Sequence, residues 1–321
     1  MRYDEVVEAV NKVIEEYTMR LTVRQIYYRL ISPPFQLFAN TSNNYKSFDK
    51  LLTRAREKQD VDWRKIEDRV RGTIGGDFGW ENVEDYLNEI IADFKNAPER
   101  YTMPVWDNQP RYVEVWVEKD ALATLFSQAA RGFRIVTFPS RGYSSLTKVM
   151  EAVSDRFIQR LKKGQQIVIL HFSDHDPSGL DMGEDLLTRF REYLATAMID
   201  EGIEEEMMVK FDEKNRALTL IRCALTYEQV QQFKLASNPT KIADPRSKDY
   251  VAKYGDQCWE LDAIPPDNLQ DIIREAINNE IDVAKWDEIL GEIEIRRHDL
   301  REKWKRLDIH FDDGVSPYRK P

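Results

Sequence analysis

Apolar residues in the first sixty positions recur every three or four residues, which is the spacing of one face of a helix. The pattern predicts helices over residues 3–17, 23–30 and about 45–58. The second helix has a capping box, because Thr22 is followed three residues later by Gln25. Short extended pieces and the glycines of GTIGG come next. Three helices followed by a small β element are typical of a winged-helix or helix-turn-helix module.

Beyond residue 110 the pattern changes to short, nearly all-apolar runs that alternate with helical periodicity. These runs and their surroundings predict strands at 112–118, 133–138, 165–172, 207–212 and 217–223. The periodic segments predict helices at 80–96, 119–130, 145–162 and 179–195. Strands that are apolar on both faces and separated by helices predict a parallel sheet covered on both sides. From Pro265 onward the chain is mostly helical and highly charged.

Two adjacent tyrosines on the predicted helix 23–30 lie on different faces of that helix. Its buried stripe, at spacing i, i+3, i+4 and i+7, comprises Val23, Ile26, Tyr27 and Leu30. Tyr28 is turned by about 100° from Tyr27 and shares a face with Arg24, four residues earlier. An arginine beside a phenol can hold a phosphate with two hydrogen bonds and favour the phenolate. The alternative is that Tyr28 is a partly exposed aromatic residue without a chemical role.

Three acidic residues follow two of the predicted strands where those strands end. Glu118 ends the first strand, and Asp174 and Asp176 lie just past the third, in SDHDPSG. Ligands of open parallel sheets bind at the carboxyl ends of the strands, and carboxylates gathered there repel each other unless a cation lies between them. Oxygen ligands without a nearby cysteine suit Mg²⁺ or Mn²⁺. Each acid also has a local explanation, since Asp176-Pro177 fits a helix N-cap and Glu118-Lys119 fits a surface ion pair.

The same stretch imitates a calcium-binding loop. DHDPSGLDMGED matches much of an EF-hand, with acids at positions 1, 3 and 12 and glycine at position 6. A strand precedes it instead of a helix, proline occupies position 4, and position 12 is Asp instead of Glu. These differences exclude calcium sensing. His175, between the two aspartates, is expected to face solvent.

The net charge of −10 hides a basic segment near the N-terminus. Residues 20–72 contain twelve Lys and Arg against six Asp and Glu, which leaves −16 on the rest of the 321-residue chain. A basic module on an acidic body fits a protein that contacts a phosphate backbone. No apolar run approaches the ~18–20 residues that span a bilayer, and MRYDEVVEAV lacks the pattern of a signal peptide. We therefore expect a cytoplasmic, nucleoid-associated protein without a membrane partner.

The cysteines add little chemistry. Cys223 and Cys258 are far apart and belong to no C-x-x-C pair. This spacing argues against a zinc site and gives no disulfide framework.

Motifs on both predicted modules resemble those of one protein family. An acid at the end of the first strand and Asp-x-Asp after a later one resemble the Toprim domain of topoisomerases, bacterial primases, recombination factors and OLD-type nucleases. TVRQIYYR resembles the nucleophile motif in the winged-helix domain of the topoisomerase VI A subunit and the meiotic Spo-eleven proteins. VEKDA and SDHDPSG resemble the strand-end motif and the Asp-x-Asp loop of that family, and the match covers roughly residues 20–200 in the same order. The chain resembles most closely the small stand-alone mini-A proteins of mobile elements, and its C-terminal third departs from the larger A subunits.

The resemblance implies an α/β fold in four parts. These are a helical winged-helix (CAP-like) DNA-binding domain at 1–78, a connecting helix and linker at 79–110, a Toprim domain with a mainly parallel, Rossmann-like sheet at 111–263, and a helical C-terminal extension at 264–321.

The resemblance also implies a type IIB topoisomerase-like reaction on double-stranded DNA. Tyr28 would attack a phosphodiester and form a phosphotyrosyl link, while Arg24 would hold the scissile phosphate. Glu118, Asp174 and Asp176 would bind Mg²⁺ or Mn²⁺. The candidate DNA contacts are Arg54, Arg56, Arg64, Lys119 and Arg141. In the family, the tyrosine of one protomer meets the metal of its partner, so the resemblance implies a homodimer.

Two other functions stay open at this point. A Toprim nuclease would use the same acids to activate water and would not need Tyr28. A non-catalytic DNA-binding protein would use the winged helix and keep the acids for structure. Since the sequence contains neither GxxxxGK[ST] nor an acid- and glycine-rich ATPase box, ATP-driven strand passage would require a separate B-type subunit.

Overall fold

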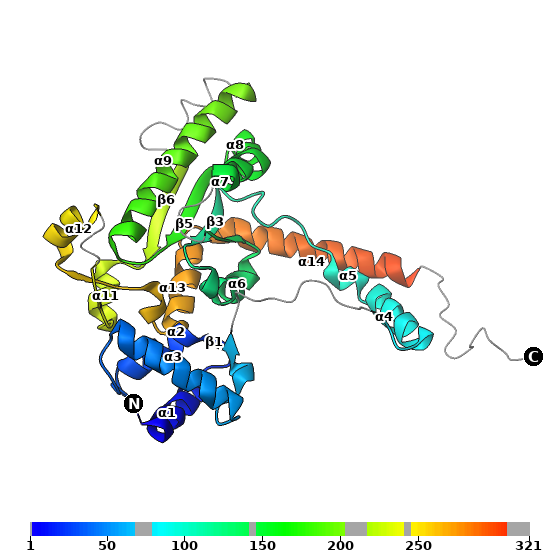
Figure 1. Cartoon of the computed structure of the whole chain (residues 1–321). Helices are drawn as coiled ribbons and strands as arrows, with labels where there is room; N and C mark the ends of the chain where they lie inside the picture. The colour runs from blue at the N-terminus through cyan, green and yellow to red at the C-terminus, as the bar shows by residue number, and fades with distance from the viewer. Residues whose placement is uncertain (1, 68–78, 141–145, 203–216, 241–244, 307–321) are drawn as a thin grey trace, which may run out of the picture. The chain divides into compact units, whose positions relative to one another are not determined.

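The computed structural model describes residues 2–67, 79–140, 146–202, 217–240 and 245–306 (Figure 1). The chain divides into two compact units, Met1–Gly72 with Pro110–Ile281 and Thr73–Gln109 with Asp282–Pro321. The segments expected to form the winged-helix and Toprim domains thus belong to one unit, and their assignment as separate domains stays a prediction. The GTIGG segment, the expected strand at 207–212 and Arg141 lie outside the described residues.

A four-stranded parallel sheet forms the centre of the first unit, in the order β4-β3-β5-β6. Its strands are β3 (Arg111–Val117), β4 (Val136–Pro139), β5 (Gln166–Phe172) and β6 (Leu218–Ala224). Val117 is in register with Pro139 on one side and Phe172 on the other, so three strands end at the same edge. The predicted α/β fold with a parallel sheet is confirmed, and β4 begins three residues later than the predicted strand.

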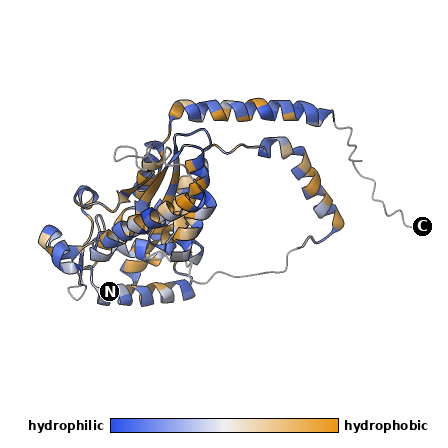
Figure 2. Cartoon of the chain, turned by 90° about the horizontal axis from the view of Figure 1, so that it is seen from above, coloured by the Kyte–Doolittle hydropathy of each residue, from blue (hydrophilic) through white to orange (hydrophobic). Residues whose placement is uncertain are grey.

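Aromatic side chains attach helices to both faces of this sheet. Trp116 packs against Phe190 of α9 (Pro177–Asp200), whereas Phe172, at the next register level, packs against Phe126 of α6 (Ala123–Ala130). Successive residues of a strand point to opposite faces, so α9 and α6 cover opposite sides (Figure 1). Figure 2 shows the strands between them in hydrophobic colours, as expected for a doubly covered sheet.

The N-terminal helices lie close to their predicted positions. They are α1 (Tyr3–Glu16), α2 (Val23–Ile31) and α3 (Ser42–Glu57), and a parallel pair of β1 (Leu21–Thr22) and β2 (Ile66–Glu67) accompanies them. The capping box of Thr22 and Gln25 is present. The third helix begins three residues earlier than predicted, because the Thr41 side chain accepts a hydrogen bond from the backbone N–H of Asn44 and caps it.

The rest of the first unit consists of shorter elements around the sheet. Single helical turns lie at Trp63–Lys65, Asp120–Leu122, Arg131–Phe133 and Leu261–Ala263. The run α7 (Leu146–Ala152), a π-helical turn (Val153–Phe157) and α8 (Ile158–Lys162) covers the predicted helix at 145–162. The remaining elements are α11 (Tyr227–Phe233), β7 (Asn238–Pro239), α12 (Ser247–Tyr254), β8 (Gln257–Cys258) and α13 (Pro266–Asn278). The strands β7 and β8 pair antiparallel.

The second unit consists of α4 (Val83–Lys95), α5 (Ala97–Arg100) and the charged helix α14 (Val283–Lys305). The indole of Trp304 on α14 donates a hydrogen bond to the carbonyl of Phe94 on α4 and packs against its ring. The helical character predicted for 80–96 and for the chain beyond 264 is therefore confirmed over the described part. None of the described helices combines the length and the apolar composition needed to cross a membrane.

We expect His171 on β5 to make stability depend on pH. It is 2% exposed, and burial, reinforced by Arg222, lowers the pKa of its imidazole from 6.5 to about 3. Between pH 6.5 and about 3, His171 binds a proton in the unfolded state but not in the folded state. The free energy of unfolding is therefore highest above pH 6.5 and decreases as the pH falls below that value. From pH 6.5 to 5 the free energy of unfolding should fall by about 2 kcal/mol.

Urea unfolding at the two pH values measures this change in the native chain and in His171→Gln. The variant should lose that part of the pH dependence. An unchanged dependence in the variant would assign it to other groups.

Candidate active site

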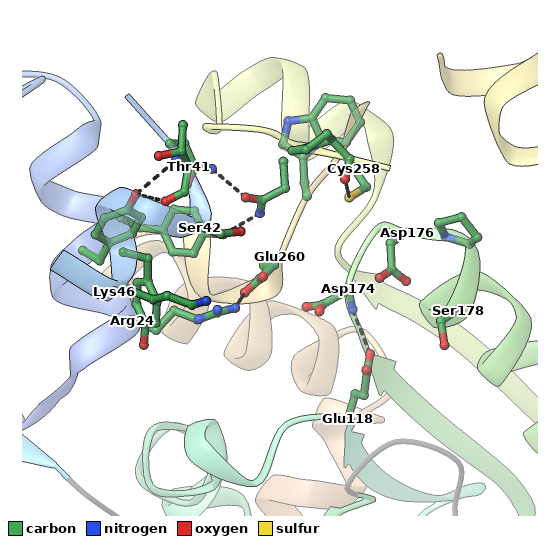
Figure 3. A pocket seen from close by; sticks show the side chains of 18 residues that line it. Arg24, Thr41, Ser42, Lys46, Glu118, Asp174, Asp176, Ser178, Cys258 and Glu260 are labelled. Carbon is green, nitrogen blue, oxygen red and sulfur yellow. Dashed lines mark hydrogen bonds and ion pairs between the residues drawn. The ribbon is translucent and has the colours of Figure 1, made fainter. Parts of the chain in front are cut away.

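A cavity of about 760 Å³ lies where α2 and the start of α3 face the carboxyl edge of the sheet (Figure 3). Arg24 and Tyr28 reach it from α2, and Ser42 and Lys46 from the first turns of α3. The sheet edge and the segment around β7 and β8 supply the opposite wall. The cavity thus brings together the two groups of residues that the sequence singled out.

The three predicted acids all line this cavity. Glu118 directly follows β3, while Asp174 and Asp176 follow β5, the neighbouring strand. The backbone N–H of Asp174 donates a hydrogen bond to the Glu118 carboxylate at 3.1 Å, and Figure 3 shows the three carboxylates on the same side of the cavity. The sheet register therefore places them together, as the strand pattern predicted.

Hydrogen bonds from side chains to backbone groups hold the loop that carries the two aspartates. The side chain of Asp176 caps α9 by accepting a hydrogen bond from the N–H of Gly179 at 2.6 Å, so the local explanation of Asp176-Pro177 is also correct. A Cβ at Gly179 would lie 2.3 Å from the carbonyl oxygen of Asp174, which requires glycine there. Arg222 of β6 donates to the carbonyls of Asp174 and Gly179. These bonds fix the loop at the strand end.

Burial dominates the electrostatics of these acids. It raises the pKa of Asp174 to about 7, against the lowering effect of Lys119. It also raises the pKa of Glu118. A bound cation would offset the burial that disfavours the charged carboxylates, and three carboxylates are the oxygen ligands that Mg²⁺ and Mn²⁺ accept. The donor set therefore fits such a cation, although within the described residues no three His, Cys, Asp or Glu side chains stand in ready-made metal-binding geometry.

Lys119 is surrounded by carboxylates. Its ammonium group lies 3.1 Å from Asp174, 3.0 Å from Glu260 and 2.6 Å from Asp262. Burial alone would lower the pKa of Lys119, but these carboxylates outweigh it and raise the pKa well above its usual value. Lys119, predicted as a DNA contact, is thus paired with carboxylates within the chain and is not free to contact a phosphate.

Arg24 is also paired within the chain. Its guanidinium forms an ion pair with Glu260 and lies over the ring of Tyr45, 4.8 Å from the centroid. Figure 3 shows Arg24 and Glu260 pointing toward each other across the cavity wall. An incoming phosphate would have to compete with Glu260 for this arginine.

The two tyrosines differ in environment, but not in the predicted way. Tyr27 is core, as predicted, and packs against Phe38, Tyr45 and Phe48. Tyr28 lies on a different face from Tyr27, as predicted, but the partial exposure that the alternative assigned to it is wrong, since only 2% of it is exposed. Its neighbour is the segment around residues 238–260, which the periodicity of one helix does not reveal.

The hydroxyl oxygen of Tyr28 accepts a hydrogen bond from Asn238 at 2.9 Å. Burial and then Glu260 raise the pKa of Tyr28, whereas Asn238, Lys119 and Arg24 lower it, and the net result is a raised pKa. Arg24 favours the phenolate in the predicted sense, but burial and Glu260 outweigh it, so the neutral phenol is the favoured form in this state of the chain.

The other predicted residues lie away from the cavity. Arg54 lies near the ring of Tyr3, Arg56 donates to Thr53, and Arg64 pairs with Asp62 on the surface. His175 was expected to face solvent, but it is buried, and its Nδ1 lies 2.9 Å from the hydroxyl of Tyr250.

Sequence reasoning missed three residues of the site. Glu260 and Asp262 in WELDAIPP hold Lys119, and Asn238 contacts Tyr28. The closely spaced acids of WELDA, directly before a proline-initiated helix, were the available signal for the first two. Asn238 lies in an irregular stretch without a comparable signal.

Comparison of the chain with models of known protein families, with curated proteins and with solved structures finds no match. The resemblance to the topoisomerase VI A subunit therefore rests on the motifs alone.

We expect Lys119→Met to destabilise the fold strongly. Removing the ammonium leaves Asp174, Glu260 and Asp262 without their shared counter-charge, and breaking such a buried pair lowers the free energy of unfolding by about 3 kcal/mol. Urea unfolding measures the loss. The matched control is Lys12→Met, which removes an exposed pair with Glu8 and should leave stability nearly unchanged. Equal effects of the two variants would contradict the assignment.

Proposed function

We propose that this chain cleaves and rejoins double-stranded DNA by transesterification, with Tyr28 as the nucleophile. Glu118, Asp174 and Asp176 hold one or two Mg²⁺ or Mn²⁺ ions. The observation that supports this proposal best is that Tyr28 and the three acids line the same cavity. A nucleophile and a set of hard-cation ligands at one cavity are the parts that phosphoryl transfer requires.

In the proposed reaction, the phenol oxygen of Tyr28 forms a bond to the scissile phosphorus while the bond to the 3′ oxygen breaks. The phenol proton passes to solvent, the 3′ oxygen takes up a proton, and the tyrosine stays linked to the 5′ end. Resealing is the same exchange in reverse, so no net bond energy is lost. A cation held by Glu118, Asp174 and Asp176 would supply a Lewis acid that polarises the phosphate and stabilises the leaving 3′ oxygen.

The chain's own residues bind and orient the strand. Ser42 and Lys46 face the cavity from the first turns of α3 (Figure 3), and hydroxyl, lysine and helix N-terminal groups are common partners of DNA phosphates. Arg24 leaves its ion pair with Glu260 and binds the scissile phosphate instead. Arg54, Arg56 and Arg64 contact the flanking backbone. Lys119 keeps the acids paired, and Arg141 contacts DNA near the metal.

We further propose a homodimer as the active form, since paired cuts in two strands need two sites. ATP-driven strand passage, where it occurs, requires a separate B-type subunit, and the family resemblance supports both points.

A metal-dependent nuclease is the second candidate, because Tyr28 is buried and its pKa is raised. In that case the same acids activate water, and Tyr28 only packs.

We expect the native chain, incubated with supercoiled DNA and Mg²⁺ or Mn²⁺ and then denatured, to be covalently attached to 5′ ends. Tyr28→Phe should reduce covalent attachment at least about 100-fold because it removes the nucleophile. Asp174→Ala should abolish cleavage of any kind. The matched control is Tyr193→Phe on α9, which makes the same change at a residue that does not line the cavity and should keep the activity.

The alternatives give different results in the same assay. If Tyr28→Phe cuts normally while Asp174→Ala does not, hydrolysis is the reaction. If no cutting occurs with either metal at several salt concentrations, the chain is a DNA-binding protein without this activity.

Mixing Tyr28→Phe with Asp174→Ala then shows which chain supplies each part. Regained nicking requires the tyrosine of one protomer to act at the acids of its partner, as the family resemblance implies. A mixture that stays inactive means that each chain uses its own acids, as the shared cavity suggests.

A further inference from the structure

A chain of two asparagines leads to the reactive oxygen of Tyr28. Asn40, which precedes the N-cap of α3, donates from Nδ2 to the carbonyl of Ser237 at 2.6 Å and to Oδ1 of Asn238 at 3.0 Å. Asn238, on β7, donates from its own Nδ2 to the hydroxyl oxygen of Tyr28 at 2.9 Å. The three side chains come from α2, the start of α3 and β7, so they meet only in the folded chain.

The polarity of this chain of hydrogen bonds is fixed by a backbone group. The carbonyl of Ser237 can only accept a hydrogen bond, so the atom of Asn40 that faces it must be the amide nitrogen. The same nitrogen faces Asn238, which must therefore present its oxygen to Asn40. Its nitrogen is left for Tyr28. The amide of Asn238 thus cannot turn over without breaking two contacts.

Both ends of the chain are anchored. The hydroxyl of Tyr27 bonds to the backbone of Thr41, and Nδ2 of Asn44 donates to the carbonyl of Ala39 at 2.8 Å. These bonds hold the segment that carries Asn40. Asn238 is held through the pairing of β7 with β8, where it lies opposite Cys258.

We propose that Asn238 is a catalytic residue that stabilises negative charge on the Tyr28 oxygen, and that Asn40 is the positioning residue that orients it. This inference rests on the proposed function. An N–H donor strengthens its bond when the acceptor becomes an anion. It therefore assists the oxygen as it loses its proton during attack. It assists the same oxygen again when the phosphorus–tyrosine bond breaks on resealing.

The other groups around Tyr28 cannot replace this donor. Glu260 acts in the opposite sense and raises the pKa of the phenol, and Arg24 and Lys119 act on it through their charge while both pair with Glu260. The ring of Tyr27, 6.0 Å away, contributes an edge contact. Among the described residues, Asn238 is the one whose hydrogen bond to the Tyr28 hydroxyl the structure shows.

The test places a fluorinated tyrosine, whose phenol ionises at lower pH, at position 28 of the full chain and follows its ionisation by absorbance. Asn238→Leu keeps the side-chain size and removes the donor, so the titration midpoint should rise by about 1 pH unit. Asn40→Leu should raise it by less, because the amide of Asn238 is then free to turn. The matched control is Asn11→Leu, which removes an amide donor to the carbonyl of Asp60 elsewhere in the first unit and should leave the midpoint unchanged.

A second measurement separates this inference from the proposed function. With unmodified Tyr28, Asn238→Leu should slow covalent attachment to DNA by about tenfold while DNA affinity stays the same. Circular dichroism confirms that each variant is folded, and Asn238→Ala replaces Asn238→Leu if the latter is not. If covalent complexes form and Asn238→Leu changes neither midpoint nor rate, the role of Asn238 is refuted and the function stands. If the midpoint shifts but neither the native chain nor any variant forms covalent complexes, Asn238 is a hydrogen-bond donor to Tyr28. Its catalytic role is then refuted together with the proposed function.

Discussion

The ion pairs of Glu260 hold the candidate site together. This half-buried carboxylate accepts hydrogen bonds from Arg24 of α2 and from Lys119 just after β3, so one acid joins the N-terminal helices to the sheet edge. Burial alone would raise the pKa of Glu260, but Lys119 and Arg24 outweigh it and lower it. Arg29, one turn further along α2, donates to the carbonyl of Ala263 at 2.8 Å and anchors the same helix again. Since buried charges are stable only when paired, these contacts determine where α2 lies and hence where Tyr28 meets the cavity.

Local patterns in the sequence predicted the parts of the site that depend on regular elements. Glu118 and Asp174 could be placed together because apolar runs mark where β3 and β5 end, and adjacent parallel strands end at one edge. Tyr27 could be assigned to the core because α2 packs on α1 and α3 through a stripe of fixed spacing. In both cases a local pattern, an apolar run or a helical period, is sufficient for the prediction.

The burial of Tyr28 could not be predicted in that way, because α2 has two neighbours. Its second face meets the segment around residues 238–263, more than 200 positions away, whose described elements are the two-residue strands β7 and β8, the short helix α12 and one helical turn. No periodicity places this segment against α2, so Asn238 carried no signal, and the closely spaced acids of WELDA marked Glu260 without indicating its neighbours. The sequence likewise made Lys119 a candidate contact for a phosphate. In the folded chain Asp262 and Glu260 lie beside Lys119 and pair with it.

Besides its part in the reaction, the expected divalent cation would offset the negative charge of the cavity. The labelled side chains in Figure 3 include the carboxylates of Glu118, Asp174, Asp176 and Glu260 but only the two cations of Arg24 and Lys46. With all six ionised, the cavity wall has a formal charge of −2, and a phosphodiester brings a further negative charge. At the short distances of a cavity such charges repel strongly. Under the proposed function, the basic residues of α3 would attract DNA to the surface, and a cation bound by the acids would offset the repulsion that the phosphate meets in the cavity. Binding of the scissile phosphate should therefore depend on the same acids as catalysis, while binding of the flanking DNA should not.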